Sequence, residues 1–241
     1  MRVLTYNVRG LRDDPRAVAR VITACRPDVV CLQEAPRLAG WRAGRRALAR
    51  ATGLVPAVNA RVGGTAVFVR PGLVVLRAEH RVLRRYPWLH TRAVAIAVLA
   101  DGRHRLTVAS LHLDLHAGAR LRHMAQVEPH LRRLARRYGA PLVVAGDCNE
   151  GPGAPARRLL GLFLDDAAEL APWGEAATFT ARRPRHRIDV VFADPGVAVV
   201  RAGVPTALVP SGALVAASDH RPVLAELTLP RWAGPRAADT P

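Results

Sequence analysis

Polar side chains interrupt the apolar segments of this chain at points where a strand would end. The residues concerned are Asn7, Glu34, His112, Asp147, Asn149, Asp189, Asp219 and His220. Side chains at strand ends converge on one rim of an α/β sheet, where such folds place their sites. Carboxylates and amides gathered there would form a cluster of hard oxygen donors, which suits Mg²⁺ or Mn²⁺ rather than zinc.

Each of these residues taken alone also has a plain structural explanation. A glutamate after an apolar run, such as Glu34, is usually a solvated strand end. The pair Gly146–Asp147 could be only a turn, and Asp219 could cap backbone amides. A single buried histidine such as His112 is more often a hydrogen-bonded partner than a catalyst. Only the set as a whole, in this order, favours a functional site.

Alternating strand-like and helix-like segments must bring these residues together. Apolar residues at helical spacing predict helices over 15–26, 41–52 and 119–138, the last kinked at Pro129. Period-two alternation and short apolar runs predict the strands, namely 2–8, 29–32, 65–70, 73–83, 92–100, 104–113, 141–145, 188–193, 197–202 and 222–229. This order of elements predicts an α/β fold.

The length and composition fit one globular domain. The chain has 241 residues, of which 50% are hydrophobic and 23% charged. No apolar run approaches the ~18 residues of a transmembrane helix, so stable membrane insertion is not expected. The first ten residues lack the apolar core of a secretory signal. Three cysteines without zinc spacing predict reduced packing thiols and a cytoplasmic location.

The charge is strongly positive. The chain carries 36 basic and 19 acidic residues, a net charge of +17, and every basic residue is arginine. Codon bias explains arginine in place of lysine, but it does not explain the excess over acidic residues. A polyanionic partner is one explanation, whether nucleic acid, anionic lipid or a phosphorylated small molecule. A generally basic surface is the other.

Seven motifs in a fixed order resemble the endonuclease/exonuclease/phosphatase superfamily. They are TYNVRG near the N-terminus, LQE at 32–34, GTAVFVR at 64–70, SLHLD at 110–114, GDCNE at 146–150, RIDVVF at 187–192 and SDHRPV at 218–223. That superfamily includes deoxyribonuclease-I-like nucleases, apurinic endonucleases, neutral sphingomyelinases and inositol polyphosphate 5-phosphatases. Cys148 and Ser110 depart from the usual pattern, but neither departure removes a catalytic group.

The resemblance implies the fold and its extent. It covers residues 1–229, which would form one catalytic domain, followed by a flexible tail over 230–241. The implied architecture is a four-layer α/β sandwich, with two mixed β-sheets packed face to face and helices outside. The protein is expected to act as a monomer.

The resemblance also implies a metal site for Mg²⁺ or Mn²⁺. Glu34 would be the principal ligand, with Asn7 and Asp219 close to the metal, directly or through its waters. Because Mg²⁺ keeps several waters and binds through few carboxylates, a sparse protein shell is expected.

The remaining residues would carry out metal-assisted attack of water on a phosphate ester. Asp147 would orient and activate the water, and Asn149 would donate a hydrogen bond to the phosphate. His220 would contact a phosphoryl oxygen, held and kept protonated by Asp189. His112 would lie near the phosphate and assist the leaving group. Substrate contacts would therefore fall to Asn149, His112 and His220.

The substrate is the least determined part of this interpretation. The positive charge favours a phosphodiester in DNA or RNA, with phosphomonoesters as a second class. The basic clusters expected near a substrate groove are Arg42, Arg45 and Arg46, and Arg182, Arg183, Arg185 and Arg187, although a solvated basic face explains them equally well. A lipid-headgroup phosphodiesterase is the alternative, with residues 86–89 as an apolar loop. A non-catalytic basic binding module is a third hypothesis.

Overall fold

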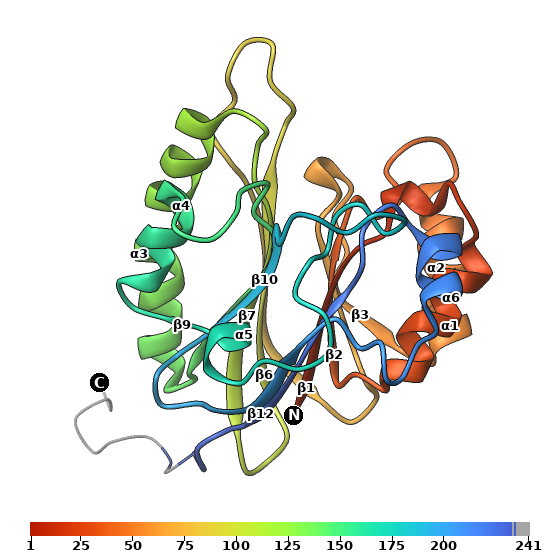
Figure 1. The fold of residues 1–241 in the computed structure, drawn as a ribbon. Coiled ribbons are helices and arrows are strands. Elements are labelled where there is room, and N and C mark those ends of the chain that lie inside the picture. Colours follow the sequence, from red (N-terminus) through yellow and green to blue (C-terminus); the bar gives the residue numbers. More distant parts are fainter. Residues whose placement is uncertain (233, 235–241) are drawn as a thin grey trace.

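The computed structural model, which describes residues 1–232 and 234, contains two six-stranded β-sheets packed face to face (Figure 1). We name the first sheet A; its strands in spatial order are β11 (Ala198–Gly203), β12 (Val223–Thr228), β1 (Arg2–Asn7), β2 (Val29–Gln33), β4 (Ala66–Val69) and β3 (Val55–Val58). Sheet B consists of β5 (Val74–Val82), β6 (Ala93–Ala100), β7 (Arg105–His112), β8 (Leu142–Asp147), β10 (Asp189–Ala193) and β9 (Asp165–Asp166).

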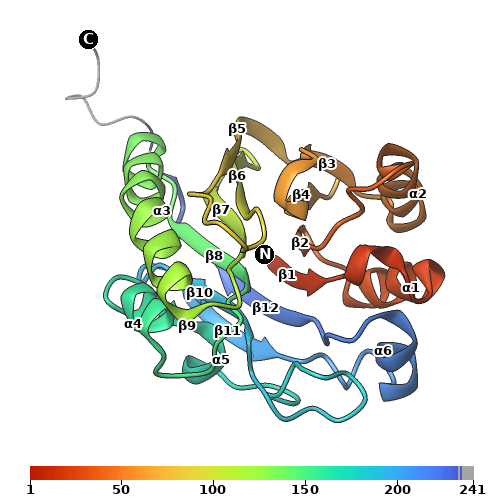
Figure 2. The same cartoon turned by 90° about the horizontal axis from the view of Figure 1, so that it is seen from above.

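Helices form the two outer layers. Those over sheet A are α1 (Pro15–Cys25), α2 (Trp41–Thr52) and α6 (Ser211–Ala217), and those over sheet B are α3 (Ala117–Tyr138) and α4 (Pro155–Gly161) (Figure 2). Three short elements complete the fold, namely α5 (Ala167–Leu170) and the 3-10 helices η1 (Arg9–Leu11) and η2 (Val62–Gly64). The expected four-layer sandwich is therefore confirmed.

Small and β-branched side chains fill the space between the two sheets. Val3 and Val67 of sheet A and Ala97 and Val143 of sheet B are fully buried there. The outer faces of the same strands are also buried, against the helices. Strands buried on both faces lose the polar alternation of half-exposed strands, which explains why β6 reads as the continuous apolar run AVAIAVLA.

One edge of the sandwich collects the ends of parallel strands from both sheets. In sheet A, β1 runs parallel to β2 and Asn7 pairs with Gln33. In sheet B, β7 runs parallel to β8 and His112 pairs with Asp147. The antiparallel strand β10 begins at this edge, where Asp189 also pairs with Asp147.

Gly146 lies inside β8 rather than in a turn, so the interpretation of Gly146–Asp147 as a turn was wrong. A Cβ atom at this position would lie 2.1 Å from the carbonyl oxygen of Leu111 on the adjacent strand. Only glycine allows the two parallel strands to approach this closely, because it has no side chain to displace the neighbouring backbone. The close approach places Asp147 beside His112.

The sequence prediction missed several elements, namely β3, β9, α4, α5 and α6. Helix α3 spans Ala117–Tyr138 with Pro129 inside it, close to the predicted range of 119–138. The three cysteines are free and buried, as expected. The predicted tail, 230–241, lies largely outside the described residues. None of the helices in the described part of the chain is both long enough and apolar enough to cross a membrane.

Candidate active site

The structure brings all eight predicted site residues to the same edge of the sandwich. Six of them line one pocket of about 460 Å³, namely Glu34, His112, Asp147, Asn149, Asp219 and His220. Asn7 and Asp189 reach this pocket through hydrogen bonds to Asp147 and His220. The pocket therefore has contributions from both sheets.

Buried, hydrogen-bonded groups form the centre of the site. His220 Nδ1 lies 2.9 Å from an Asp189 carboxylate oxygen, and its Nε2 lies 3.7 Å from Asp147 Oδ2. Asn7 Nδ2 donates to the same Asp147 oxygen at 3.1 Å. The Phe179 ring packs against the His220 imidazole with 4.8 Å between centroids. These contacts fix the imidazole between the two carboxylates.

Burial and nearby charges have opposing effects on the pKa values of His220 and Asp147. Burial lowers the pKa of His220, but the charge of Asp189, its hydrogen bond and the charge of Asp147 outweigh that effect and raise the pKa to about 9. Burial and the repulsion of Asp189 raise the pKa of Asp147 to about 7, against the attraction of His220. At neutral pH the site therefore offers a cationic imidazole beside a carboxylate that can accept a proton.

His112 is held in its neutral form by a residue that the sequence analysis missed. Arg92 Nη1 lies 2.9 Å from His112 Nε2, and because a guanidinium only donates, Nε2 must accept. Burial, Arg92 and His220 lower the pKa of His112 well below its usual value. An imidazole whose Nε2 already accepts from Arg92 is better suited to positioning than to protonating a leaving group.

Arg92 is itself buried at the pocket and is incompletely paired. Its Nε atom lies 3.7 Å from Asp114 Oδ2, and both atoms lack a hydrogen-bond partner within the described residues. Arg92 also lines the pocket, and a guanidinium in that position can bind an anionic oxygen. A sequence signal existed, since Arg92 directly precedes the apolar strand β6, which pairs with β7 at the His112 end.

Asn149 has a backbone conformation that few residue types adopt. Its φ is 51°, in the left-handed region where asparagine is favoured among non-glycine residues. Its backbone N–H donates to Asp147 Oδ1 at 2.9 Å, and its side-chain amide donates to the Leu113 carbonyl at 3.0 Å. This anchoring places the amide in the pocket wall beside Asp147.

Two of the three predicted metal ligands, Glu34 and Asp219, form a more open part of the site, whereas Asn7 is buried. Glu34 is exposed to the pocket, and Asn7 Nδ2 contacts its carboxylate at 3.4 Å. The side-chain oxygen of Asn7, Oδ1, accepts from the Arg9 backbone N–H at 3.1 Å, which leaves it one lone pair for a metal. Asp219 lines the same pocket but pairs with Arg9 Nε at 3.3 Å.

A second group could also hold a cation. One ligand atom from each of Asp147, Asp189 and His220 lies within 4.8 Å of the others. His220, however, already uses Nδ1 in its hydrogen bond to Asp189. The Glu34 carboxylate has more free oxygen lone pairs, and carboxylate oxygens are the donors that Mg²⁺ prefers.

Arg45, predicted to lie near a substrate groove, is fully buried instead. It donates to the carbonyl oxygens of Pro36 at 2.8 Å and Ala60 at 2.9 Å, and to Asn59 Oδ1 at 2.9 Å. Burial lowers its pKa to about 10. Arg45 thus holds the segment after Glu34 against the segment that precedes η2, and it cannot contact a substrate.

The other predicted arginines differ in their positions. Arg42 and Arg46 are exposed on α2 and do not line the site pocket. Arg187 pairs with Asp166 at 3.0 Å. Arg182, Arg183 and Arg185 are exposed on the segment between Phe179, which contacts His220, and Asp189. None of these three lines the site pocket, although Arg182 lines an adjacent pocket together with Asp219.

Basic side chains that the prediction did not include also line the pocket. Arg12, Arg37 and His90 line it together with Arg92. In the described residues no carboxylate lies within ion-pairing distance of Arg12 or Arg37. A pocket lined by unpaired guanidinium groups is suited to phosphate oxygens.

Comparison with known proteins gives a family match and several similar structures. A family model described as "Endonuclease/Exonuclease/phosphatase family" matches residues 4–220. Among curated proteins, none is similar enough in sequence to count as a match.

Three solved structures illustrate the structural similarity. A protein of unknown function from Enterococcus faecalis V583 has a TM-score of 0.80 and 22% identity, covering 95% of this chain and 100% of that one. The mannosyl-6-phosphatase Bt3783 of Bacteroides thetaiotaomicron has a TM-score of 0.78 and 19% identity, with coverage of 95% and 100%. The human Nocturnin catalytic domain, with bound sulfate, has a TM-score of 0.71 and 18% identity, with coverage of 95% and 93%. At these identities the similarity establishes the fold alone.

Proposed function

The chain belongs to the endonuclease/exonuclease/phosphatase family, and we propose that it is a Mg²⁺- or Mn²⁺-dependent phosphoester hydrolase. Phosphodiesters are the proposed substrates, nucleic acid first among them, with phosphomonoesters as a second class. One observation carries the proposal: Asp147 lies between Asn7 and His220 in a pocket lined by unpaired cationic groups.

The side chains of the pocket have separate roles in the proposed hydrolysis. Asp147, with a pKa near neutrality, takes a proton from the attacking water, as an efficient general base requires. His220, kept protonated by Asp189, donates a hydrogen bond to a phosphoryl oxygen. Asn149 and Arg92, which also line the pocket, donate to the phosphate. Preorganised donors of this kind stabilise the charge of the transition state.

The residues present suit a hard divalent cation, which prefers oxygen ligands. Glu34 would hold it, with Asn7 and Asp219 nearby, because the Glu34 carboxylate faces the pocket with little hydrogen bonding to the protein. When bound, such an ion neutralises charge on the phosphoryl oxygens.

The test is an assay of the purified protein with Mg²⁺ or Mn²⁺ on four substrates in parallel. These are plasmid DNA, structured RNA, bis-p-nitrophenyl phosphate and p-nitrophenyl phosphate, and His220→Ala is the control. Cleavage that needs metal and is lost in the variant would support the proposal, and the preferred substrate would identify the class. If the folded protein binds Mn²⁺ but cleaves none of the four substrates, that result would contradict the proposal.

A lipid phosphodiester is the second candidate substrate, and a specific observation favours it. Trp88, in the loop between β5 and β6, is fully exposed, and the same loop contributes His90 and Arg92 to the pocket. Leu115, 67% exposed, lines the pocket itself, and Leu38, 64% exposed, follows Arg37. Exposed aromatic and aliphatic side chains beside arginines suit an anionic lipid surface.

Vesicle flotation separates the two substrates. Binding to phosphatidylglycerol vesicles that is lost in Trp88→Ala would favour lipid. Leu162→Ala is the matched control, because Leu162 is 80% exposed but does not line the pocket. Equal flotation of the wild type and both variants would leave nucleic acid as the preferred substrate.

A further inference from the structure

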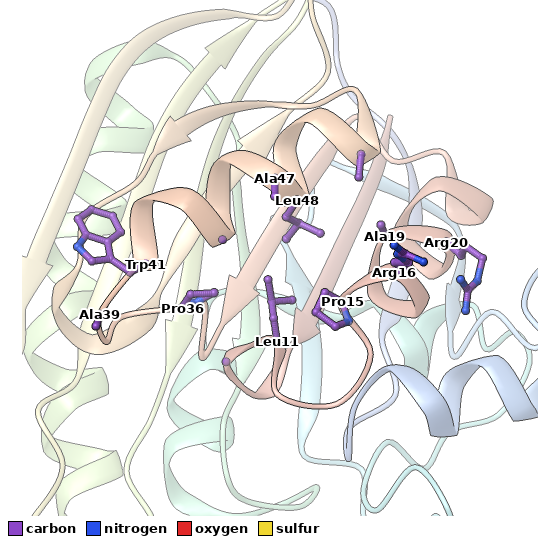
Figure 3. A pocket seen from close by; sticks show the side chains of 14 residues that line it. Leu11, Pro15, Arg16, Ala19, Arg20, Pro36, Ala39, Trp41, Ala47 and Leu48 are labelled. Carbon is purple, nitrogen blue, oxygen red and sulfur yellow. The ribbon is translucent and has the colours of Figure 1, made fainter.

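A second cavity, of about 610 Å³, lies between α1 and α2 on the outer side of sheet A (Figure 3). It shares no lining residue with the active-site pocket. Its volume is within the range of small-molecule sites, about 300–1,000 Å³.

The cavity exists because the facing side chains of α2 are small. Gly44, Ala47 and Ala51 lie on the side of α2 that turns toward α1, where Ala19 faces them. Neighbouring helices normally interdigitate larger side chains along such a contact. In this pair the small residues leave an elongated hollow between the helices.

The walls of the hollow are apolar along its length and cationic at one end. Leu11, Pro15 and Pro36 form the floor, and Trp41 lies at the end opposite Arg16 and Arg20 (Figure 3). The described lining includes no acidic residue. Arg20 makes a 3.3 Å contact with Asp14, whereas the Arg16 guanidinium has no carboxylate partner within the part of the chain described. The cavity thus complements a molecule with an apolar body and an anionic end.

We propose that this cavity binds a medium-chain acyl carboxylate. The acyl chain lies along the small residues of α2, and the carboxylate pairs with Arg16 and Arg20. An unbranched acyl chain fits because the lining between Trp41 and the arginines carries no polar side chain.

The floor of the cavity connects this ligand to the active site. Leu11 follows Asn7 by four residues, Pro36 follows Glu34 by two, and the Gly10 N–H donates to the Glu34 carbonyl at 2.8 Å. Leu11 and Glu34 both have left-handed backbones, with φ of 57° and 48°. Such strained residues persist only where their surroundings hold them. An acyl chain against Leu11 and Pro36 therefore changes the position of the Glu34 carboxylate, a step that rests on the proposed function.

Titration calorimetry with sodium decanoate tests the binding directly. Wild type is expected to bind decanoate and not decyltrimethylammonium, which has the same chain and the opposite charge. Ala47→Trp fills the hollow and should abolish binding. Ala43→Trp is the matched control, since Ala43 is exposed on the same helix but does not line the cavity. Arg16→Glu should weaken binding about tenfold or more, as loss of a charged contact does.

Any of three results would overturn the proposed binding site: no decanoate binding by wild type, equal decanoate binding by Ala47→Trp and wild type, or equal affinity of wild type for decanoate and decyltrimethylammonium. The coupling is tested separately, as the Mg²⁺ midpoint for hydrolysis with and without saturating decanoate. A shifted midpoint in wild type that is absent in Ala47→Trp supports the coupling, and an unchanged midpoint in wild type overturns it. If the protein hydrolyses no phosphate ester, the proposed function fails while calorimetry still decides the site.

Discussion

The two halves of the active site are constructed differently. On the sheet B side, His112, Asp147 and Asp189 are almost completely buried, and each is fixed by at least one side-chain contact. On the sheet A side, Asn7 and His220 are also buried, but Glu34 is exposed and Asp219 is partly exposed. The chain therefore fixes the side chains proposed to handle protons and leaves the carboxylates proposed to hold a metal more open to the pocket. Mutations on the two sides should therefore differ in kind.

The largest effect should come from the centre of the buried half. Asp147→Asn keeps the shape of the side chain but removes its ability to accept a proton, so kcat should fall about 10²- to 10⁴-fold. Steady-state rates on bis-p-nitrophenyl phosphate measure this fall. Asp101→Asn, in the β6–β7 turn, is the control and should retain activity. If kcat fell by less than about threefold, Asp147 would not be the general base.

Arg92→Met should have the next largest effect. The substitution removes a buried donor from the pocket wall and frees His112 Nε2, so kcat/KM should fall about 10²-fold. Arg105→Met removes an arginine stacked on Trp232 outside the pocket, and it should leave kcat/KM unchanged. Equal losses in the two variants would show that Arg92 acts only through stability.

Asp189→Asn should change the pH profile as well as the rate. Burial lowers the pKa of His220, but mainly Asp189, with help from Asp147, raises it to about 9, so protonated His220 is available below that pH and is lost as pH rises through it. Without the carboxylate charge the alkaline limb of kcat should move to lower pH, with about a tenfold loss of rate at pH 8. The Mg²⁺ midpoint should stay where it is. An unshifted alkaline limb with unchanged turnover would contradict this role for Asp189.

The smallest effect on kcat should come from the open half. Glu34→Gln should raise the Mg²⁺ concentration needed for half-maximal activity about tenfold or more, because even outer partners of metal ligands cause such losses. Saturating Mg²⁺ should restore most of the rate, unlike in Asp147→Asn. Glu128→Gln, on α3, provides the matched control. A rate that no Mg²⁺ concentration changes would show that Glu34 is not a ligand.

Local patterns predicted the main elements and the site residues for the same physical reason. Strands buried on both faces give apolar runs, and a polar residue that ends such a run must lie at an edge of the sheet. Asn7, His112 and Asp147 all followed from this rule. The short elements β9 and α5 did not, because two and four residues carry no periodicity.

The sequence analysis was least accurate in placing the arginines. Arg45 was expected on a substrate groove and is buried under backbone carbonyls, while Arg92 was not considered and lies at the site. In a chain with 36 arginines, the residue type alone cannot distinguish a solvated cation from a buried one. The distinction depends on which carbonyls and side chains the fold places around each guanidinium, and only tertiary structure provides that.

Gly146 has a consequence for how the chain can evolve. It carries no reactive group, yet the space for its missing side chain is occupied by the Leu111 carbonyl. In a library of single variants this position should therefore be as intolerant as the catalytic positions, because every replacement would separate β7 from β8. A lineage could exchange surface arginines freely while this glycine stays fixed, so invariance at Gly146 would record the spacing of two strands rather than a chemical role.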